Sequence, residues 1–292
     1  MNPKRTMKKL FTSTLLIGCL VSSWAATTID PVNKFAYGAN IGWLNAAADG
    51  ANGAVVNDYT CSGYIYAANV GWINLGSGSP ANQIRYQNNS ATDFGVNNDG
   101  LGNLRGYAWG ANIGWINFEN TGAPKINIKD GRFSGYVWSA NCGWISLSNA
   151  FAYVQTDHIL PGPLDANGLP IAWEMANFGV TGIDPNADLD HDGQSNLQEY
   201  LAGTDPNIAS DYLHITSASF GPGGTTATLT WTSVLTRNYY IQETLFLNPT
   251  IIWTESGLGI IAPDGGAATV RSFVDAIAPV RYYRIEAVRT LP

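Results

Sequence analysis

Oxygen-bearing side chains recur at every second position in the segment Asp188–Glu199. This spacing matches a loop whose oxygens at positions 1, 3, 5, 7, 9 and 12 surround one hard divalent cation. The six positions hold Asp188, Asp190, Asp192, Gln194, Asn196 and Glu199. The aspartates would supply carboxylate oxygens, Gln194 its backbone carbonyl, Asn196 a direct or water-mediated contact, and Glu199 two oxygens. With Gly193 providing the sharp turn, the segment predicts a calcium loop.

The stretch around this loop carries an unbalanced charge. Between His158 and Ser210 there are eight acidic residues and no lysine or arginine. The eight are Asp165, Glu174, Asp184, Asp188, Asp190, Asp192, Glu199 and Asp205. Like charges at this density repel one another unless a counter-charge neutralises them. A solvated acidic turn is the alternative, but the complete spaced pattern is more specific than a count of acids and favours bound Ca²⁺.

Two short helices are expected next to the loop. Leu197–Ala202 follows directly, and Gly203 and Pro206 are residue types that end a helix. Leu169–Phe178 is an apolar helix candidate that ends several residues before the loop. His191 occupies a variable loop position and is not a ligand candidate. The few histidines and cysteines are scattered, so no zinc site can be assembled from them.

The loop resembles known calcium segments. Asp188–Glu199 is similar to an EF-hand loop, and residues 184–206 resemble the dockerin-like and thrombospondin type 3-like segments of secreted bacterial proteins. The resemblance covers roughly residues 165–210 and contains one full loop, whereas dockerins carry two. The single loop, and the gap between Leu169–Phe178 and Asp188, argue against a calcium sensor that opens a helix pair. Asp184 and Asn186 continue the alternating oxygens, which leaves open a second ion shared with Asp188.

An internal repeat fills the first half of the chain. Four segments share the order aromatic, small, Ala, Asn, apolar, Gly, Trp, aliphatic, at residues 37–45, 66–74, 109–117 and 138–146. Their Gly-Trp tryptophans are spaced by 29, 43 and 29 residues, so a pair of units recurs every 72 residues. Such self-similarity indicates stacked copies of one small structural unit.

Each repeat unit is interpreted as an antiparallel hairpin. Strand-forming aromatic residues precede the Ala-Asn-x-Gly segment, and its Asn and Gly tolerate the positive φ of a tight reversal. Further strands are expected at 53–57, 94–97, 125–128 and 151–154. Because the first unit lacks a leading strand and the last has a spare one, the ends could pair and close a ring. A barrel, a sandwich and a small propeller all remain open.

The repeated aromatic residues have two interpretations. Aromatics at fixed positions in stacked units usually build a continuous core, and this interpretation is favoured for the repeat tryptophans. Aromatic-rich β-repeats can also stack sugars, and the candidates for facing a ligand are Tyr37, Tyr66, Trp109 and Trp138. The repeat asparagines, Asn40, Asn69, Asn112 and Asn141, are better explained by turn geometry than by binding.

The last part of the chain returns to a strand pattern. Six short strands are expected at 213–217, 227–231, 239–243, 251–253, 269–274 and 282–287, with turn clusters at 221–224 and 263–266. Through Leu229-Thr-Trp231, Tyr240-Ile-Gln242 and Tyr283-Arg-Ile285 this part resembles a fibronectin type III or immunoglobulin-like sandwich. The resemblance implies a spacer or attachment module by analogy of fold alone.

The first residues have the pattern of an export signal. Basic residues in Met1–Lys9 precede a short apolar run and Ser23-Trp24-Ala25, which predicts a signal peptide cleaved after Ala25. Leu16–Cys19 resembles a lipobox, so a lipid on Cys19 is the alternative. No apolar run approaches the ~20 residues of a transmembrane helix. Export also permits a disulfide between Cys61 and Cys142, which the sequence leaves open.

The net charge and the absence of catalytic motifs argue against two classes of function, nucleic-acid binding and catalysis. Cleavage removes four of the 15 basic residues and none of the 22 acidic ones, and the resulting net charge of −11 disfavours a nucleic-acid partner. No serine-hydrolase, zinc-protease or P-loop motif is present, so an enzyme is not expected, and an unrecognised hydrolase is a distant alternative.

The sequence as a whole predicts a mainly β chain: signal peptide 1–25, repeat domain 26–157, calcium connector 158–210 and sandwich 211–292. Its predicted function is that of a secreted calcium-binding surface or structural protein with a glycan, cell-surface or matrix partner. The alternative is a carbohydrate-binding component of a polysaccharide-degrading system.

Overall fold

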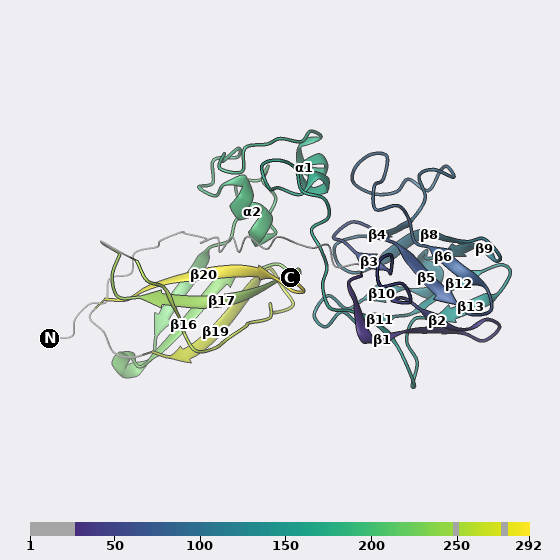
Figure 1. The fold of residues 1–292 in the computed structure, drawn as a ribbon. Helices are drawn as coiled ribbons and strands as arrows, with labels where there is room; N and C mark the ends of the chain where they lie inside the picture. Colours follow the sequence, from purple (N-terminus) through teal and green to yellow (C-terminus); the bar gives the residue numbers. More distant parts are fainter. Residues whose placement is uncertain (1–26, 248–250, 276–279) are drawn as a thin grey trace. The chain divides into compact units, whose positions relative to one another are not determined.

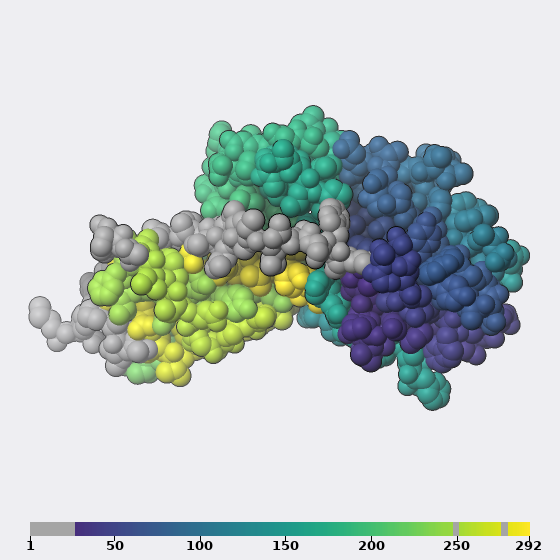
Figure 2. Space-filling view, in the orientation of Figure 1, coloured from purple at the N-terminus to yellow at the C-terminus, as the bar shows by residue number. Residues whose placement is uncertain are grey.

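The computed structural model describes residues 27–247, 251–275 and 280–292, and the other residues are grey in Figures 1 and 2. The expected signal peptide and the lipobox at Cys19 therefore lie outside the described residues. The described chain forms two compact units. The barrel unit comprises residues 27–183 with 291–292, and the sandwich unit comprises residues 184–290.

The chain is mainly β, as the sequence predicts, but the division into units differs from the expected one. Residues 158–210 do not form a unit of their own. Their first part, with helix α1 (Ile171–Phe178), belongs to the barrel unit. The predicted calcium loop and helix α2 (Asn196–Ala202) belong to the sandwich unit, so the loop is part of a larger fold rather than of a free linker.

The repeats form an antiparallel barrel of eight strands (Figure 1). The strands are β1 (Ile29–Gly38), β2 (Gly42–Asn45), β5 (Tyr64–Ala67), β6 (Gly71–Asn74), β8 (Leu104–Gly110), β9 (Gly114–Asn117), β12 (Tyr136–Ser139) and β13 (Gly143–Ser146). Hairpins one to four are β1–β2, β5–β6, β8–β9 and β12–β13. They follow one another around the ring, and β13 pairs with β1, with Tyr37 opposite Ser146. The expected ring closure is confirmed, and it gives a barrel.

The strands outside the hairpins are short, and two of them, at 61–62 and 133–134, were not expected from the sequence. They are β3 (Val55–Val56), β4 (Cys61–Ser62), β7 (Val96–Asn98), β10 (Lys125–Ile126), β11 (Phe133–Ser134) and β14 (Val154–Thr156). β3 pairs with β4, β7 with β8, and β10 with β11, while β14 pairs with the first part of β1. The spare strand at the end of the repeats thus does meet the first strand.

The repeat tryptophans lie on the outside of the barrel, so their interpretation as core is wrong. Trp43, Trp72, Trp115 and Trp144 are each 45% to 47% exposed, whereas the aliphatic residue after each one is buried. Side chains along a strand alternate between the two faces, so only one of two neighbours can point inward. An eight-stranded barrel has an interior just wide enough for its own side chains. Aliphatic residues fill that space, and the larger indoles remain outside.

The barrel interior repeats every second hairpin. Hairpins one and three place Ala and Gly inward on their first strand, at Ala36 and Gly38 and at Ala108 and Gly110. A Cβ on Gly38 would lie 2.8 Å from Ile41 Cγ1, and one on Gly110 would lie 2.7 Å from Ile113 Cγ1. Hairpins two and four carry larger residues at the equivalent inward positions, which are Ile65, Ala67, Val137 and Ser139. Small and large pairs alternate around the ring, in agreement with the 72-residue period.

A ring of asparagine side chains joins the four hairpin turns. The Nδ2 of each repeat asparagine donates to a backbone carbonyl in the turn of the preceding hairpin. The bonds are Asn69 to Ile41 at 3.1 Å, Asn112 to Val70 at 3.0 Å, Asn141 to Ile113 at 3.0 Å and Asn40 to Cys142 at 3.1 Å. The last bond closes the ring. The asparagines do not have the positive φ that the sequence predicts for them. They lie in the turns, and their side chains join each turn to the preceding one.

The glycines of these turns do have the predicted backbone conformation. Gly71 has φ of 79° and Gly114 has φ of 70°, in the left-handed region that glycine adopts without a steric penalty. The next hairpin's asparagine amide lies close by, because a Cβ on Gly71 would stand 3.5 Å from Asn112 Nδ2. Each turn therefore needs glycine for its backbone conformation, and it needs the asparagine side chain for its hydrogen bond to the neighbouring turn.

The sandwich unit consists of two antiparallel three-stranded sheets. One has the order β15 (Ile215–Phe220), β16 (Thr226–Thr232), β19 (Ala268–Val274), and the other β18 (Thr254–Glu255), β17 (Arg237–Thr244), β20 (Tyr282–Arg289). Both sheets supply the core, in which Leu229 and Trp231 of β16 meet Tyr239 and Ile241 of β17. The strand expected at 251–253 is not formed, and pairing begins at Thr254. The expected sandwich is thus largely confirmed.

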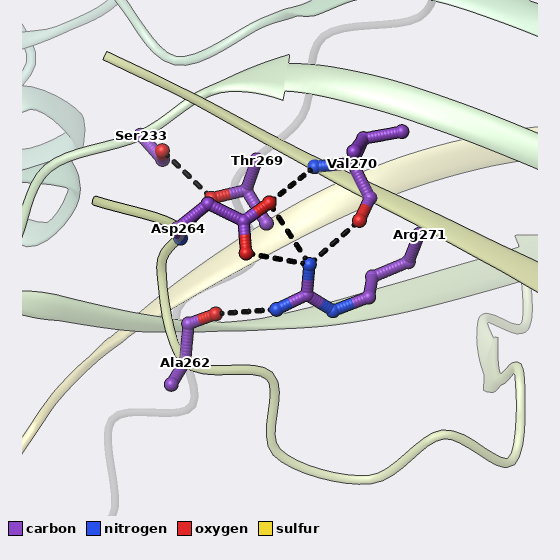
Figure 3. Close-up of polar contacts among 6 residues, drawn as sticks. All are labelled: Ser233, Ala262, Asp264, Thr269, Val270 and Arg271. Carbon is purple, nitrogen blue, oxygen red and sulfur yellow. Dashed lines mark hydrogen bonds and ion pairs between the residues drawn. The ribbon is translucent and has the colours of Figure 1, made fainter. Parts of the chain in front are cut away.

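An ion pair fastens the loop between β18 and β19 (Figure 3). Arg271 Nη1 contacts both oxygens of Asp264 at 2.9 and 3.0 Å, and Arg271 Nη2 donates to the Ala262 carbonyl at 2.9 Å. The Val270 N–H also donates to Asp264. This N–H and then the Arg271 guanidinium hold the pKa of Asp264 below its usual value. The contacts are local and structural.

Both described cysteines, Cys61 and Cys142, are buried and free, so the disulfide that the sequence left open is absent. Burial raises the pKa of Cys61 to about 12. Of the helices in the described residues, neither has the length and apolar character needed to cross a membrane.

Candidate metal centre

The predicted calcium loop ends in a helix whose two ends are both fixed. Ser195 is the N-cap of α2, and it forms a capping box in which its Oγ accepts from Gln198 N–H and Gln198 Oε1 accepts from Ser195 N–H. Gly203, with φ of 77°, ends the helix as predicted. Arg237 from β17 donates to the carbonyls of Tyr200 and Leu201 at 2.7 and 2.6 Å. α2 is therefore tied to the sandwich, and it presents Glu199 from a rigid support.

Backbone N–H groups of the loop orient the three aspartates. Both oxygens of Asp188 accept, from His191 N–H at 2.8 Å and Gly193 N–H at 2.9 Å. Asp190 Oδ1 accepts from Asp192 N–H, and Asp192 Oδ1 accepts from Gln194 N–H. These bonds turn the carboxylates toward one another, so that oxygens of the three aspartates lie within 4.8 Å. No other group of three or more acidic, histidine or cysteine ligands is found in the described part of the chain.

Five buried oxygens of this loop receive no hydrogen bond from any described residue. They are Asp190 Oδ2, Asp192 Oδ2, Asn196 Oδ1 and both carboxylate oxygens of Glu199. Asn196 and Glu199 are completely buried. A buried acceptor without a donor costs free energy, and a buried carboxylate without a partner costs more. Four of the six predicted ligands thus carry buried oxygens without a hydrogen-bond partner, which a bound cation would stabilise. The structure brings the three aspartates together, whereas Glu199 is not part of that group.

The orientation of the Asn196 amide follows from its surroundings. Its Nδ2 donates to the Asp184 carbonyl at 2.8 Å, and a carbonyl can only accept. The other end of the amide, Oδ1, is therefore the end left for a cation. The buried Gln194 lies between Asp192 and Asn196, where the sequence predicts its backbone carbonyl as a ligand. Asp184 is exposed and is not part of the three-aspartate group.

The local electrostatics also match a cation site. Burial, and then the neighbouring carboxylates, raise the pKa of Glu199 to about 8. Burial is likewise the main cause that raises the pKa of Asp192, with Asp190 and Asp188 adding to it against the Gln194 N–H bond. A divalent cation would reverse both effects, because it binds the charged carboxylates. The donors are all oxygens, the ligand class that Ca²⁺ prefers, and His191 is exposed.

The candidate ligand-facing aromatics lie on the outer face of the barrel. Tyr37, Tyr66, Trp109 and Trp138 are 37% to 41% exposed. Within each hairpin, each is the direct cross-strand partner of the Gly-Trp tryptophan. In the first three hairpins the two ring centroids lie 4.7 to 4.9 Å apart. Across each hairpin junction, each stands opposite an Asn or Ser: Ser146, Asn45, Asn74 and Asn117 respectively.

The tryptophans of the Gly-Trp pairs are surface residues that sequence reasoning missed. In Gly-Trp-Ile-Asn both the indole and the isoleucine are apolar, so these two residues alone do not tell which one faces inward. The Asn or Ser two residues after each tryptophan is polar and lies on the same face as the tryptophan, and this alternation is the signal that could have placed the indole outside. Residue size against the barrel radius is a second cue.

Comparison with known proteins gives no family or neighbour: no family model, curated protein or solved structure matches this chain.

Proposed function

We propose that this chain is an exported, non-catalytic, calcium-binding protein that acts at the cell surface or in extracellular material. Calcium would stabilise the sandwich unit, and the aromatic outer face of the barrel would contact a partner. The observation that carries the calcium assignment is the set of buried, unpartnered oxygens of Asp190, Asp192, Asn196 and Glu199. The likeness to dockerin-like and thrombospondin type 3-like segments points the same way.

The ion would have a structural role. Extracellular calcium modules have dissociation constants of about 10⁻⁴–10⁻³ M, so such a site is filled outside the cell at millimolar calcium. The loop is tied to β17 through α2 and Arg237, and this arrangement suits a fixed support rather than a helix that swings open. Asp188, Asp190, Asp192 and Glu199 would hold the ion, with Gln194 and Asn196 completing the shell.

Calcium titration with limited proteolysis of the whole chain tests the proposal. We expect heat of binding for one ion, a higher melting temperature with calcium, and faster cleavage within residues 180–210 when a chelator is added. Asp190→Asn should remove these effects, whereas Glu255→Gln, on the exposed β18, should keep them. Equal proteolysis with and without calcium would contradict the assignment.

A second candidate is a carbohydrate-binding component of a polysaccharide-degrading system. It is favoured by the exposure of the aromatic pairs around the barrel, since exposed aromatic surface of this extent usually marks an interaction site. Retention of the chain on insoluble polysaccharides is the direct test. Release of sugar by the purified chain would instead contradict the non-catalytic proposal.

A further inference from the structure

We propose that a surface pocket between the third and fourth hairpins of the barrel binds one neutral sugar ring of a glycan. The pocket lies where β9 pairs with β12, and its volume is about 180 Å³. It is lined by Asn117, Glu119, Thr121, Gly122, Trp138 and Trp144. The inference rests on the interaction role proposed for the barrel, and it gives that role a ligand class and a location.

One wall of the pocket is aromatic. Trp138 and Trp144 are direct cross-strand partners and are 41% and 46% exposed. The face of an indole carries partial negative charge, whereas the C–H groups on one face of a pyranose ring carry partial positive charge. A sugar ring laid against the indoles gains this attraction and removes apolar surface from water. The two tryptophans therefore offer a stacking surface for a ring that also carries hydroxyl groups.

Another part of the lining is a turn that is held closely against the fourth hairpin. The 3-10 turn η1 (Asn120–Gly122) follows β9, and a Cβ on Gly122 would stand 1.9 Å from the Tyr136 carbonyl oxygen. Only glycine permits so close an approach to the β12 backbone. The turn is thus fixed on its neighbour, and the hollow between them is a feature of the backbone rather than of loose side chains.

Glu119 departs from the repeat at this junction. It stands two residues after Asn117, and the equivalent residues of the other hairpins are Ala47, Gly76 and Ser148. The backbone at these positions is alike, because Asn45, Asn74 and Asn117 each accept from the N–H two residues on, at 2.6 to 3.0 Å. In the second hairpin the equivalent Gly63 N–H donates to the Gly76 carbonyl at 3.3 Å, whereas Gly106 N–H donates to the Glu119 carboxylate. The repeat can therefore satisfy this donor without a carboxylate, and Glu119 adds a second, charged oxygen at this junction.

The Glu119 carboxylate is oriented by the barrel. Its Oε1 accepts from Gly106 N–H at 2.8 Å, and no described residue donates to its Oε2. Oε2 is available as a strong acceptor for a sugar hydroxyl, because hydrogen bonds to an ionised group are stronger than neutral ones. The amide of Asn117 uses Oδ1 for the Glu119 N–H, which leaves its NH₂ group to donate. Stacking, an acceptor and a donor thus converge on one small pocket.

Its size and charge favour a neutral sugar over an organic cation. The pocket is smaller than the ~300–1,000 Å³ of sites for drug-sized ligands, which suits one ring of a longer chain. Glu119 is the single charged residue among those lining it, and Gly106 already offsets part of that charge. The junctions of Asn45 with Tyr66 and of Asn74 with Trp109 repeat the pairing of an aromatic with a neutral amide, but Ala47 and Gly76 stand there in place of Glu119.

Titration of the whole, calcium-loaded chain with soluble hexasaccharides tests the inference. The probes are cellohexaose, xylohexaose and chitohexaose, and the readouts are calorimetry and tryptophan fluorescence. At least one should bind, with little dependence on salt. Trp144→Ala should weaken it by about tenfold or more, as truncation of a buried aromatic contact does. Glu119→Gln, which keeps the size and the acceptor for Gly106, should weaken it several-fold. Trp72→Ala is the matched control, at the same repeat position and with the same 46% exposure, and should leave binding unchanged.

The outcomes separate this inference from the calcium proposal. If no hexasaccharide binds while calcium still titrates normally, the inference is wrong and the calcium proposal stands. If Trp72→Ala weakens binding as much as Trp144→Ala, sugars bind around the barrel and not in this pocket. If choline binds in a salt-dependent manner that Glu119→Gln removes, the pocket is a cation site. Unchanged melting temperatures of the variants show that each result is not caused by unfolding.

Discussion

Replacement of Glu199 by glutamine should stabilise the metal-free protein at alkaline pH and make the protein insensitive to calcium. Glutamine has the shape of glutamate and no charge to bury. Its NH₂ group would face Asp190 Oδ2 and Asp192 Oδ2, which no described residue contacts in the native loop. It would therefore substitute for the cation in part, while removing two of the oxygens that the cation needs.

The size of the effect follows from the pKa of Glu199. In the metal-free fold this pKa is about 8, against an ordinary value of 4.5. Between these values the native state holds a proton that the unfolded chain has lost, so stability falls as the pH rises, by about 1.4 kcal/mol per pH unit. The full cost is roughly 5 kcal/mol above pH 8, and it vanishes below pH 4.5. Glu199→Gln has no such cost. Calcium at ten- to a hundredfold excess over its dissociation constant should stabilise the unmodified protein by about 1.4 to 2.7 kcal/mol.

Hydrogen exchange over residues 186–204, together with calorimetric melting, measures both effects. The experiment compares the unmodified chain, Glu199→Gln and the exposed control Glu255→Gln at pH 5 and pH 8.5, with chelator and with calcium. The variant should be more protected than the unmodified chain in chelator at pH 8.5, similar at pH 5, and unresponsive to calcium. Equal protection of the two proteins in chelator at pH 8.5 would refute the reasoning, as would an equal response to calcium.

Three further predictions concern the loop, the turns and the cysteines. Because Glu199 with a pKa of about 8 is mostly protonated at pH 7, calcium binding there should release about 0.9 proton and far less at pH 9, as measured by calorimetry in buffers of different ionisation enthalpy. Gly71→Val should lower barrel stability by about 1–3 kcal/mol in urea unfolding, since φ is 79°, whereas Gly50→Val, which meets no atom within 4 Å, should cost little. Cys61, buried and with its pKa raised to about 12, should resist iodoacetamide at pH 8 until the protein unfolds; rapid labelling of the folded chain would contradict this.

The sequence could locate the candidate metal site because its proposed ligands are local. The positions of Asp188 to Glu199 in one short loop fix which oxygens can converge, and only the burial of Asn196 and Glu199 needed the structure. The packing of α2 on β17 could not be predicted from the sequence, because Arg237 lies 36 residues after Leu201, whose carbonyl it contacts. That long-range contact is why the loop belongs to the sandwich unit and not to a separate connector.

In the repeat domain the strand pairing could be predicted from the sequence, but the placement of key side chains was not predicted. Hairpins and ring closure could be predicted, since they follow from the local pattern and from the leftover strand near residue 154. The outward direction of Trp43 and its equivalents was missed because both residues of a Trp-Ile pair are apolar, although the polar residue two positions after each tryptophan lies on the same face. The hydrogen bond from the Asn40 side chain to the Cys142 carbonyl joins residues 102 positions apart, and it forms only when the barrel closes. The pocket at Trp138 likewise needs the close approach of Gly122 to Tyr136, which no local pattern indicates.

The asparagine ring has a consequence for how this architecture could arise. Each turn gives one amide to the turn before it and offers one carbonyl to the turn after it, and the bond from Asn40 to Cys142 is equivalent to the other three. A chain with only two hairpins would end with one unmatched amide at one side and one unmatched carbonyl at the other. Two such chains are complementary to each other and should complete the same ring as a homodimer. The 72-residue period is what gene duplication and fusion of such a half-barrel ancestor would leave.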